Sequence, residues 1–289
     1  MQAVKRNFRT AEMSESEARQ KGPFRGETEL IANLFAPLAR DYDGALGLID
    51  DAALVTPAAG EELVLTADML VAGVHFLENA DPSDAAFKAL AVNVSDLIAK
   101  GAVPEIYLLT IALPGTPDRA WLQGLTSGFA DAQAAFGCVL AGGDTVSTPG
   151  PLTMSITAIG RVPAGSMVRR SGARAGDRVY VTGTIGDAAV GLKWLRAGNA
   201  RPQSAISGEE AEYLGSRYWR PRPNTALASI LRVHANGAMD ISDGLAGDFE
   251  KLCAASQCGG SINASRISVT KFRNTILAVN RKIIAPASC

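Results

Sequence analysis

The sequence predicts a mixed α/β (or α+β) protein of two domains. Its 289 residues are enough for two hydrophobic cores, and 47% of them are hydrophobic against 20% that are charged, as in ordinary globular proteins. Strand-like and helix-like segments alternate loosely rather than as strict strand–helix–strand units, which favours mixed layers over a doubly wound sheet. A basic, glycine-bearing connector over 169–177 separates the two halves, and we place the domain boundary there.

The first half is predicted from two kinds of periodicity. Residues 1–24 are polar and lack periodicity, which predicts a mobile extension. Apolar side chains at helical spacing predict helices over 27–40, 85–100 and 119–136. Short apolar runs predict strands over 46–49, 53–55, 63–66 (ended by a turn at Asp68), 105–113, 138–141 and 152–162.

The second half is predicted to begin with a strand over 178–182 and a glycine-rich turn over 183–187. Helices are expected over 188–197, 209–218, 225–236 and 245–256, and a strand-like segment over 260–263. The predicted organisation is therefore a first domain over 25–168, a second domain over 169–262 and a basic tail over 263–289.

Composition excludes several classes of function. A net charge of −1 gives no reason to expect a nucleic-acid partner, and no apolar run approaches the 18 residues of a membrane span. The start of the chain has no continuous apolar core of the signal-peptide kind. The four cysteines form no CxxC pair and the chain has only two histidines, so we expect reduced thiols and no zinc in a cytoplasmic protein.

Charge is unevenly distributed along the chain. Every acidic residue lies at or before Glu250, whereas the residues from Lys251 onward include basic side chains and no acidic one. Such a break indicates a separate tail or a changed reading frame.

Aspartates follow apolar runs at several places, and this is the main functional signal. The segments end at Asp50–Asp51, Asp68, Asp96, Asp144 and Asp240–Asp243. Each aspartate on its own is explained by turn formation, because aspartate accepts hydrogen bonds from nearby backbone amides. Together they suggest oxygen ligands for Mg²⁺ that bridges phosphates, and an adjacent carboxylate pair such as Asp50–Asp51 repels itself unless a cation or water intervenes.

Three further elements have both a structural and a functional interpretation. The turn over 183–187 is a structural turn or a phosphate-binding helix N-terminus, and no GxxxxGK[ST] motif occurs in the chain. Arg169–Arg170 is a solvated linker pair or a contact to nucleotide phosphate. His75 is structural or touches substrate. No Ser/His/Asp or Cys/His set stands out, which suits in-line phosphoryl transfer to an acceptor that is already ionised, with no general base.

These residues fall in motifs that resemble the thiamine-monophosphate kinase family, within the aminoimidazole ribonucleotide synthetase-like (PurM-like) superfamily. The resemblance covers about residues 26–262. The matching motifs are Gly26–Glu27 with Leu30–Ile31, Asp50–Ala53, Thr66–Asp68 with Leu70–Phe76, Lys88–Leu97, Gly142–Thr145, Arg170–Gly172, Val181–Gly183 and Asp240–Leu245. The His75–Phe76 pair favours the thiamine enzyme over its relatives.

The resemblance implies ATP-dependent phosphorylation of thiamine monophosphate to thiamine diphosphate with several Mg²⁺ ions. It also implies a homodimer formed through the N-terminal domains and an active site in the cleft between domains. His75 would touch the substrate. The implied metal ligands are Asp51 with its neighbour Asp50, Thr66, Asp68, Asp96, Asp144, Asp240 and Asp243. The implied ATP contacts are Gly143, Asp144, Arg170 and Ser242.

The sequence also departs from the family pattern. Members have a glycine-rich acidic segment and a late aromatic residue that helps to hold thiamine, and residues 263–289 contain neither, which predicts a truncation or frameshift near Asn263. Ile49 stands where a glycine often precedes the aspartate pair. Two alternatives therefore remain beside the kinase: a sister ATP-dependent synthetase, or a nucleotide- and Mg²⁺-binding protein with impaired catalysis.

Overall fold

A computed structural model describes residue 24 and residues 26–198 and 207–268. The predicted extension over 1–24 lies outside the described residues except for Phe24, and the predicted tail does so from residue 269 onward.

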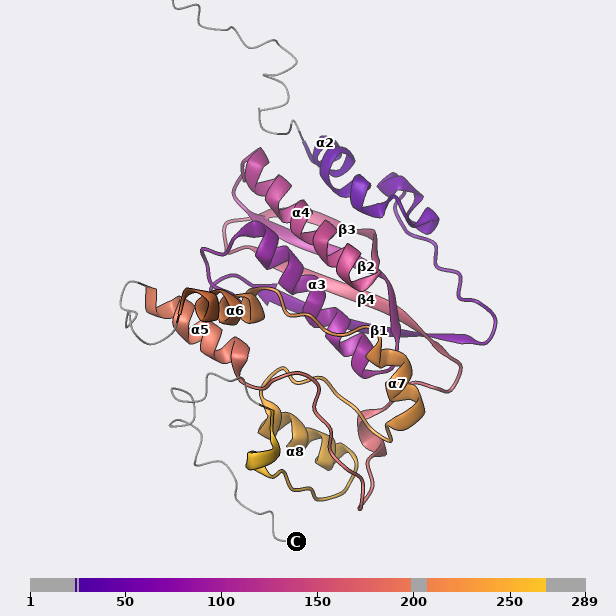
Figure 1. Ribbon diagram of the computed structural model, residues 1–289. Coiled ribbons are helices and arrows are strands. Elements are labelled where there is room, and N and C mark those ends of the chain that lie inside the picture. The colour runs from indigo at the N-terminus through magenta and orange to yellow at the C-terminus, as the bar shows by residue number, and fades with distance from the viewer. Residues whose placement is uncertain (1–23, 25, 199–206, 269–289) are drawn as a thin grey trace, which may run out of the picture.

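The first half of the chain is built on a four-stranded mixed sheet (Figure 1). Its order is β1-β4-β2-β3, with antiparallel pairing of β4 to both β1 and β2, and parallel pairing of β2 to β3. The strands are β1 (Glu61–Val71), β2 (Val103–Pro114), β3 (Val139–Thr148) and β4 (Thr153–Pro163). The predicted mixed α/β class is confirmed.

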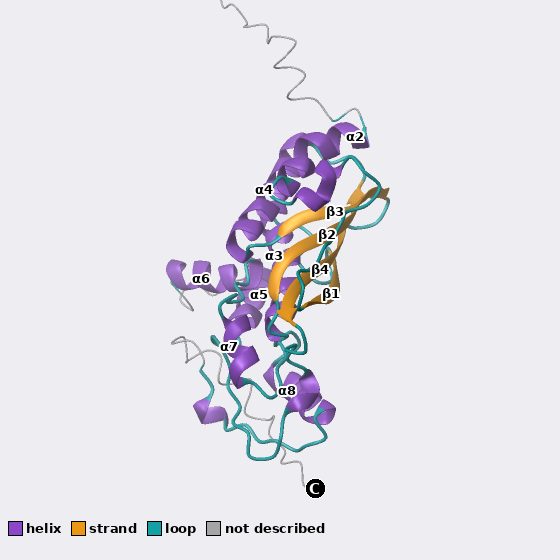
Figure 2. Ribbon diagram, turned by 90° about the vertical axis from the view of Figure 1, so that its right-hand side faces the viewer, coloured by secondary structure: helices purple, strands orange, loops and turns teal. Residues whose placement is uncertain are grey.

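Helices α3 (Pro82–Ala99) and α4 (Arg119–Phe136) cover one face of this sheet (Figure 2). Both begin at an aspartate cap, because Asp81 accepts from Ser83 N and Asp118 accepts from Trp121 N. Between helices and sheet lies one large core, in which alternate strand residues pack against apolar helix positions. The fully buried side chains include Phe87, Leu90, Val94, Leu97, Tyr107, Ile111, Leu125, Phe129, Met154 and Ile156.

Ahead of the sheet, the single helix predicted over 27–40 is broken into three short turns. These are α2 (Glu27–Leu30), a π-helical turn η1 (Ile31–Phe35) and a 3₁₀ turn η2 (Ala36–Ala39). Pro37 explains the break, since it has no backbone N–H to donate to the preceding turn.

The strands predicted over 46–49 and 53–55 are wrong. The 3₁₀ segment η3 (Asp43–Leu48) occupies the first of these ranges, and residues 53–55 have no regular structure. Leu46 and Leu48 have φ of 52° and 57°, which takes the backbone out of the extended region.

The sheet strands are longer than predicted, and this changes where two aspartates lie. Asp68 lies inside β1 rather than in a turn after it, and Asp144 lies inside β3 rather than beyond it. Asp96 likewise lies within helix α3 and not at the end of an element. The expectation that the carboxylates lie at element ends is therefore wrong for Asp68 and Asp144, whereas Asp96 lies inside the helix that was predicted over 85–100.

The described part of the second half is helical. Its helices are α5 (Asp187–Ala197), α6 (Gly208–Trp219), α7 (Leu227–His234) and α8 (Leu245–Ala255). The strands predicted over 178–182 and 260–263 are wrong, because neither range is paired in a sheet in the structure. An extended segment without a neighbouring strand has no partner for its backbone groups, and Tyr180 is 82% exposed.

Polar contacts along α3 join the second half to the first. Lys100 Nζ donates to Ala238 O at 2.7 Å, and the Arg232 guanidinium donates to Gly101 O. At the other end of α3, Arg220 donates to Asp84 and Ser83 and also reaches Asp131 on α4. Helix α3 is thus the element on which the two halves meet, as Figure 1 shows for α6 and α7.

Candidate active site

The site begins with a contact between β1 and α3. Thr66 Oγ1 donates to Asp96 Oδ2 at 2.9 Å. Asp68, two residues further along β1, points to the same face, and its backbone N donates to Asn93 Oδ1 at 2.9 Å. Asn93 is fully buried and is fixed in turn by Ala89 O, so its amide holds β1 against the helix at this point.

Asp68 has a raised pKa. Burial is the largest cause, the charge of Asp96 adds to it, and His75 acts in the opposite direction. The His75 ring is held by its own loop, because Nδ1 accepts from Val71 N at 3.0 Å. Asp96 and His75 therefore both lie close enough to Asp68 to influence its carboxylate electrostatically.

Asp240 reaches the same cluster from the second half of the chain. Burial, then the charge and hydrogen bond of Asp96, raise the pKa of Asp240 to about 6, and the charges of Asp248 and Asp68 add to the effect. Three carboxylates from β1, α3 and the segment before α8 thus share one region. We call Thr66, Asp68, Asp96 and Asp240 the acidic cluster.

Two cations flank the acidic cluster. Burial, followed by the charge of Arg170, lowers the pKa of Lys100, whereas Asp96 and Asp240 oppose that shift. Sequence reasoning predicted Arg170 but missed Lys100. The signal for Lys100 was its spacing of four residues from Asp96, which places both on one side of a helix end.

Ser242 and Asp243 lie in a loop that is organised by an aspartate that sequence reasoning also missed. Asp248 Oδ2 accepts from the backbone N of Ser242, Asp243 and Gly244 at 3.0, 3.0 and 3.2 Å. Lys251 Nζ binds both Asp243 Oδ2 and Asp248 Oδ1. The Asp243 carboxylate is therefore held by Lys251.

The remaining predicted ligands lie elsewhere. Asp50 and Asp51 occupy an exposed bend ahead of β1, where Asp51 N donates to Asp50 Oδ1 at 2.7 Å. Asp144 lies on β3, at the opposite edge of the sheet from β1, which corresponds to three strand spacings or about 14 Å. Gly143 before it is required by close packing, since a Cβ there would lie 1.8 Å from Leu109 O.

The acidic cluster has the donor chemistry that suits Mg²⁺, because its groups are carboxylate and hydroxyl oxygens. Within the described residues, no three carboxylate, thiol or imidazole groups form a preassembled metal cage. Mg²⁺ does not need such a cage, since it keeps several waters and binds through one or two carboxylates together with substrate phosphates. Burial, and then the like charge of Asp96, raises the pKa of both Asp68 and Asp240, and a bound cation would stabilise their charged forms.

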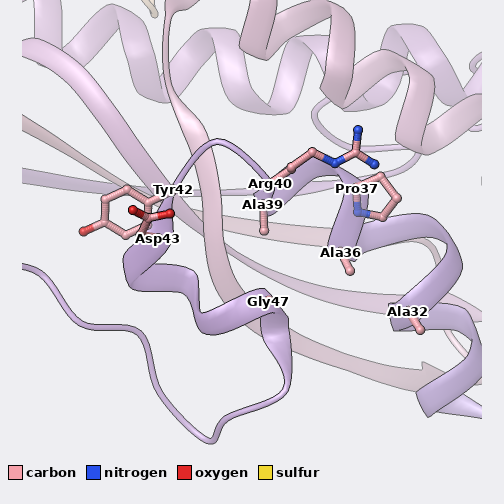
Figure 3. A pocket seen from close by; sticks show the side chains of 8 residues that line it. All are labelled: Ala32, Ala36, Pro37, Ala39, Arg40, Tyr42, Asp43 and Gly47. Carbon is pink, nitrogen blue, oxygen red and sulfur yellow. The ribbon is translucent and has the colours of Figure 1, made fainter.

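A separate pocket of about 450 Å³ lies among the N-terminal helical turns (Figure 3). Figure 3 shows Tyr42 and Asp43 on one side of it and Ala32, Ala36 and Pro37 on the other. None of the predicted site residues lines this pocket, so we do not assign it to the reaction.

No helix in the described part of the chain is both long enough and apolar enough to cross a bilayer.

Two family models together match most of the chain. Residues 49–162 match the AIR synthase related protein N-terminal domain, and residues 174–280 match the AIR synthase related protein C-terminal domain. The chain is therefore a two-domain AIR synthase related protein. Within that class it belongs to the thiamine-monophosphate kinase family, as the sequence motifs indicated. It is 44% identical to thiamine-monophosphate kinase of Escherichia coli K12 over 82% of this chain and 71% of that protein.

Other thiamine-monophosphate kinases are also similar to this chain over most of its length. Thiamine-monophosphate kinase of Caulobacter vibrioides is 40% identical over 84% of this chain and 67% of its own length. The crystal structure of thiamine-monophosphate kinase from Stenotrophomonas maltophilia superposes with a TM-score of 0.77 at 36% identity, covering 86% of this chain and 78% of that one. AaThiL complexed with AMPPCP and TMP gives a TM-score of 0.69 at 30% identity, covering 86% and 75%.

Proposed function

We propose that this protein is a kinase that transfers the γ-phosphoryl group of ATP to the phosphate of thiamine monophosphate, giving thiamine diphosphate and ADP. The observation that supports the proposal most directly is the acidic cluster, where Asp68 and Asp96 of the first half meet Asp240 of the second beside Arg170. Family membership supports it independently, and the related AaThiL was crystallised with AMPPCP and TMP.

The reaction needs positioning and charge neutralisation more than proton transfer. The acceptor is a phosphate, which is already ionised near neutral pH, so no general base is required. Arg170 is suited to bind ATP phosphate oxygens through its planar guanidinium, and Lys100 adds a second positive charge beside the carboxylates. Mg²⁺ held by the acidic cluster would neutralise phosphate charge when bound.

We also assign binding roles to the predicted residues outside the acidic cluster. His75 adjoins Asp68, where it would contact thiamine monophosphate, and Gly143 and Ser242 would contact ATP. Asp144 would serve both ATP and metal. We expect Asp50, Asp51, Asp144 and Asp243 to bind further Mg²⁺ ions along the phosphates rather than the ion held by the acidic cluster.

We also infer a homodimer formed through the N-terminal domain. Leu65 and Met69 lie on β1 and alternate with Val64 and Leu70, which are buried under the helices. They are 60% and 56% exposed, on the sheet face opposite α3 and α4. Apolar side chains gathered on an open sheet face are typical of a protein–protein interface.

The function is tested by product analysis with a panel of acceptors. Purified protein is incubated with ATP and Mg²⁺ plus thiamine monophosphate, thiamine or aminoimidazole ribonucleotide precursors, and ADP and thiamine diphosphate are quantified. We expect ADP only with thiamine monophosphate, in equal amount to thiamine diphosphate, and none after chelation of Mg²⁺. ADP formed only with another acceptor would favour a sister synthetase, and tight ATP binding without turnover would favour a binding protein.

A further inference from the structure

The end of helix α8 brings two cysteines together. Cys258 N donates to Cys253 O at 3.1 Å and Gln257 N donates to Ala254 O at 3.1 Å. Gln257 has φ of 54°, in the left-handed region. This pattern of hydrogen bonds and backbone conformation is a Schellman motif, with Cys253 and Cys258 as its first and sixth residues.

A Schellman motif places the side chains of these two positions against each other. The contact is usually apolar, but here both partners are thiols. Both cysteines are free and partly exposed, and Cys258 lies close enough to Cys253 to add to the burial that raises the pKa of the Cys253 thiol. The motif therefore holds two accessible thiols side by side without any covalent link.

Ser256, between the two cysteines, connects this motif to the candidate ATP site. Ser256 Oγ donates to Arg170 O at 3.0 Å and accepts from Ala173 N at 3.2 Å. The turn that contains Arg170 is therefore held by Ser256, which lies between Cys253 and Cys258 in the motif.

We propose that Cys253 and Cys258 form a reversible intrachain disulfide that displaces Ser256 and weakens the hold on the Arg170 turn. A disulfide has an S–S bond of about 2.05 Å and a C–S–S–C dihedral near 90°, both more restrictive than a non-bonded contact between two thiols. Closing the ring therefore draws the two Cβ atoms together and shifts the residues between them. The effect on nucleotide binding rests on the proposed role of Arg170 in ATP recognition.

The oxidant we propose is a small-molecule disulfide of the glutathione type. One cysteine thiolate attacks a sulfur of the oxidant, forming a mixed disulfide and releasing one small thiolate. The second cysteine thiolate then displaces the other small thiolate and closes the Cys253–Cys258 bond. The protein loses two protons and two electrons, and the oxidant is reduced to two thiols. Burial and the neighbouring Cys258 raise the pKa of Cys253.

The first arm of the test counts thiols and is independent of activity. The full chain with Cys289→Ser, a position outside the described residues, is equilibrated with oxidised glutathione, alkylated, unfolded and mapped by mass spectrometry. We expect a peptide in which Cys253 is linked to Cys258, with Cys138 still reduced because it is buried in the first half. The matched Cys258→Ser variant should form no intrachain link. Persistence of both thiols, or a glutathione adduct without the link, would overturn the proposal.

The second arm measures AMPPCP affinity by calorimetry with Mg²⁺ present. Oxidation should weaken binding roughly tenfold, the size of one lost charge-assisted hydrogen bond, and dithiothreitol should restore it. Cys253→Ser and Cys258→Ser should be insensitive to the oxidant. Equal affinity of fully oxidised and reduced protein would overturn the link to Arg170. A reduced protein that does not bind AMPPCP would instead contradict the proposed function. In that case the mass-spectrometric mapping of the first arm would still show whether the Cys253–Cys258 disulfide forms.

Discussion

The hydroxyl of Thr66 donates a hydrogen bond to the carboxylate of Asp96 across 2.9 Å, and so joins strand β1 to helix α3 at the acidic cluster. The bond fixes the orientation of a carboxylate that also raises the pKa of both Asp68 and Asp240. Asp96 is thus the shared neighbour of the two other carboxylates, and it is the residue whose charge matters most to the cluster.

Replacing Asp96 by asparagine should abolish most of the activity without harming the fold. The amide oxygen can still accept from Thr66, so the shape and the hydrogen bond are retained while the negative charge is lost. We expect kcat for thiamine diphosphate formation to fall roughly 100-fold or more, as when a preorganised electrostatic group is removed. The midpoint of thermal unfolding should be unchanged or slightly higher, because repulsion among the carboxylates is relieved.

The matched control for this variant is Asp41→Asn, at an exposed position outside the acidic cluster. It removes the same charge from the protein and should leave kcat unchanged. Equal turnover of Asp96→Asn and the parent protein would remove Asp96 from the reaction.

Regular elements with strong local signals were predictable from the sequence. Helix α4 was predicted to the residue from apolar periodicity, and α3 to within three residues, because the Asp81 cap that begins α3 was not used. Helix α2 with its following turns was predicted as one element, since its apolar pattern continues through Pro37 although the hydrogen bonding does not.

The acidic cluster was harder to predict because its geometry depends on distant parts of the chain. Asp68 and Asp144 were assigned to turns since polar residues usually end strands, but the structure keeps both within strands. Asp68 tolerates its place in β1 because buried Asn93, from α3, accepts from its backbone. Lys100 was overlooked because its partner, Ala238, is far away in sequence.

Charged substitutions on the open face of the sheet should separate the proposed dimer. Leu65→Glu and Met69→Glu place carboxylates at exposed apolar positions of β1, where burial in an interface would be costly. We expect the parent to sediment as a dimer at micromolar concentration and the double variant as a folded monomer. Val233→Glu is the control, since Val233 is 75% exposed on α7, away from the sheet, and should leave the dimer intact. A monomeric parent would contradict the homodimer.

Two helical glycines should respond to alanine in opposite ways. A Cβ on Gly191 of α5 would lie 2.1 Å from Leu214 O of α6, so Gly191→Ala must push the two helices apart. A Cβ on Gly215 of α6 meets nothing within 4 Å, and alanine there should stabilise the helix by about 0.5–1 kcal/mol. Urea denaturation should show a free energy of unfolding that falls for Gly191→Ala and rises for Gly215→Ala. Equal signs would show that α5 and α6 do not cross closely.

Arg220 should be an anchor between the two halves. Its guanidinium donates to Asp84 and Ser83 on α3 and to Asp131 on α4. Arg220→Met should lower the free energy of unfolding by about 2 kcal/mol, because charge-assisted hydrogen bonds are lost together. Arg220→Lys should not restore it, since an ammonium cannot reproduce the planar fork. Arg222→Met, at an exposed neighbouring position, should change stability by less than about 0.5 kcal/mol, and an equal loss in both would argue against the anchor.

Lys88 should give the stability of the protein a measurable pH dependence. Burial lowers the pKa of Lys88 from 10.5 to about 8, and its Nζ lies 3.6 Å from the centre of the Tyr218 ring. Below pH 8 the amine is charged in both folded and unfolded chains, so the full cost of burying the charge is present. Between pH 8 and 10.5 the unfolded chain binds more protons than the folded one, and stability contributed at this site therefore rises with pH.

The lowered pKa of Lys88 alone corresponds to about 3 kcal/mol of destabilisation of the folded chain at neutral pH. Attraction between the Lys88 ammonium and the Tyr218 ring offsets about 1–2 kcal/mol of this cost. Lys88→Met should therefore be more stable than the parent by about 1–2 kcal/mol at pH 7. This advantage should shrink steadily between pH 8 and 10 when chemical denaturation is followed at each pH. Lys193→Met, at an exposed position on α5, should show a difference from the parent that does not change over this range. A flat difference for Lys88→Met as well would mean that the Lys88 amine is solvated and does not bury its charge against Tyr218.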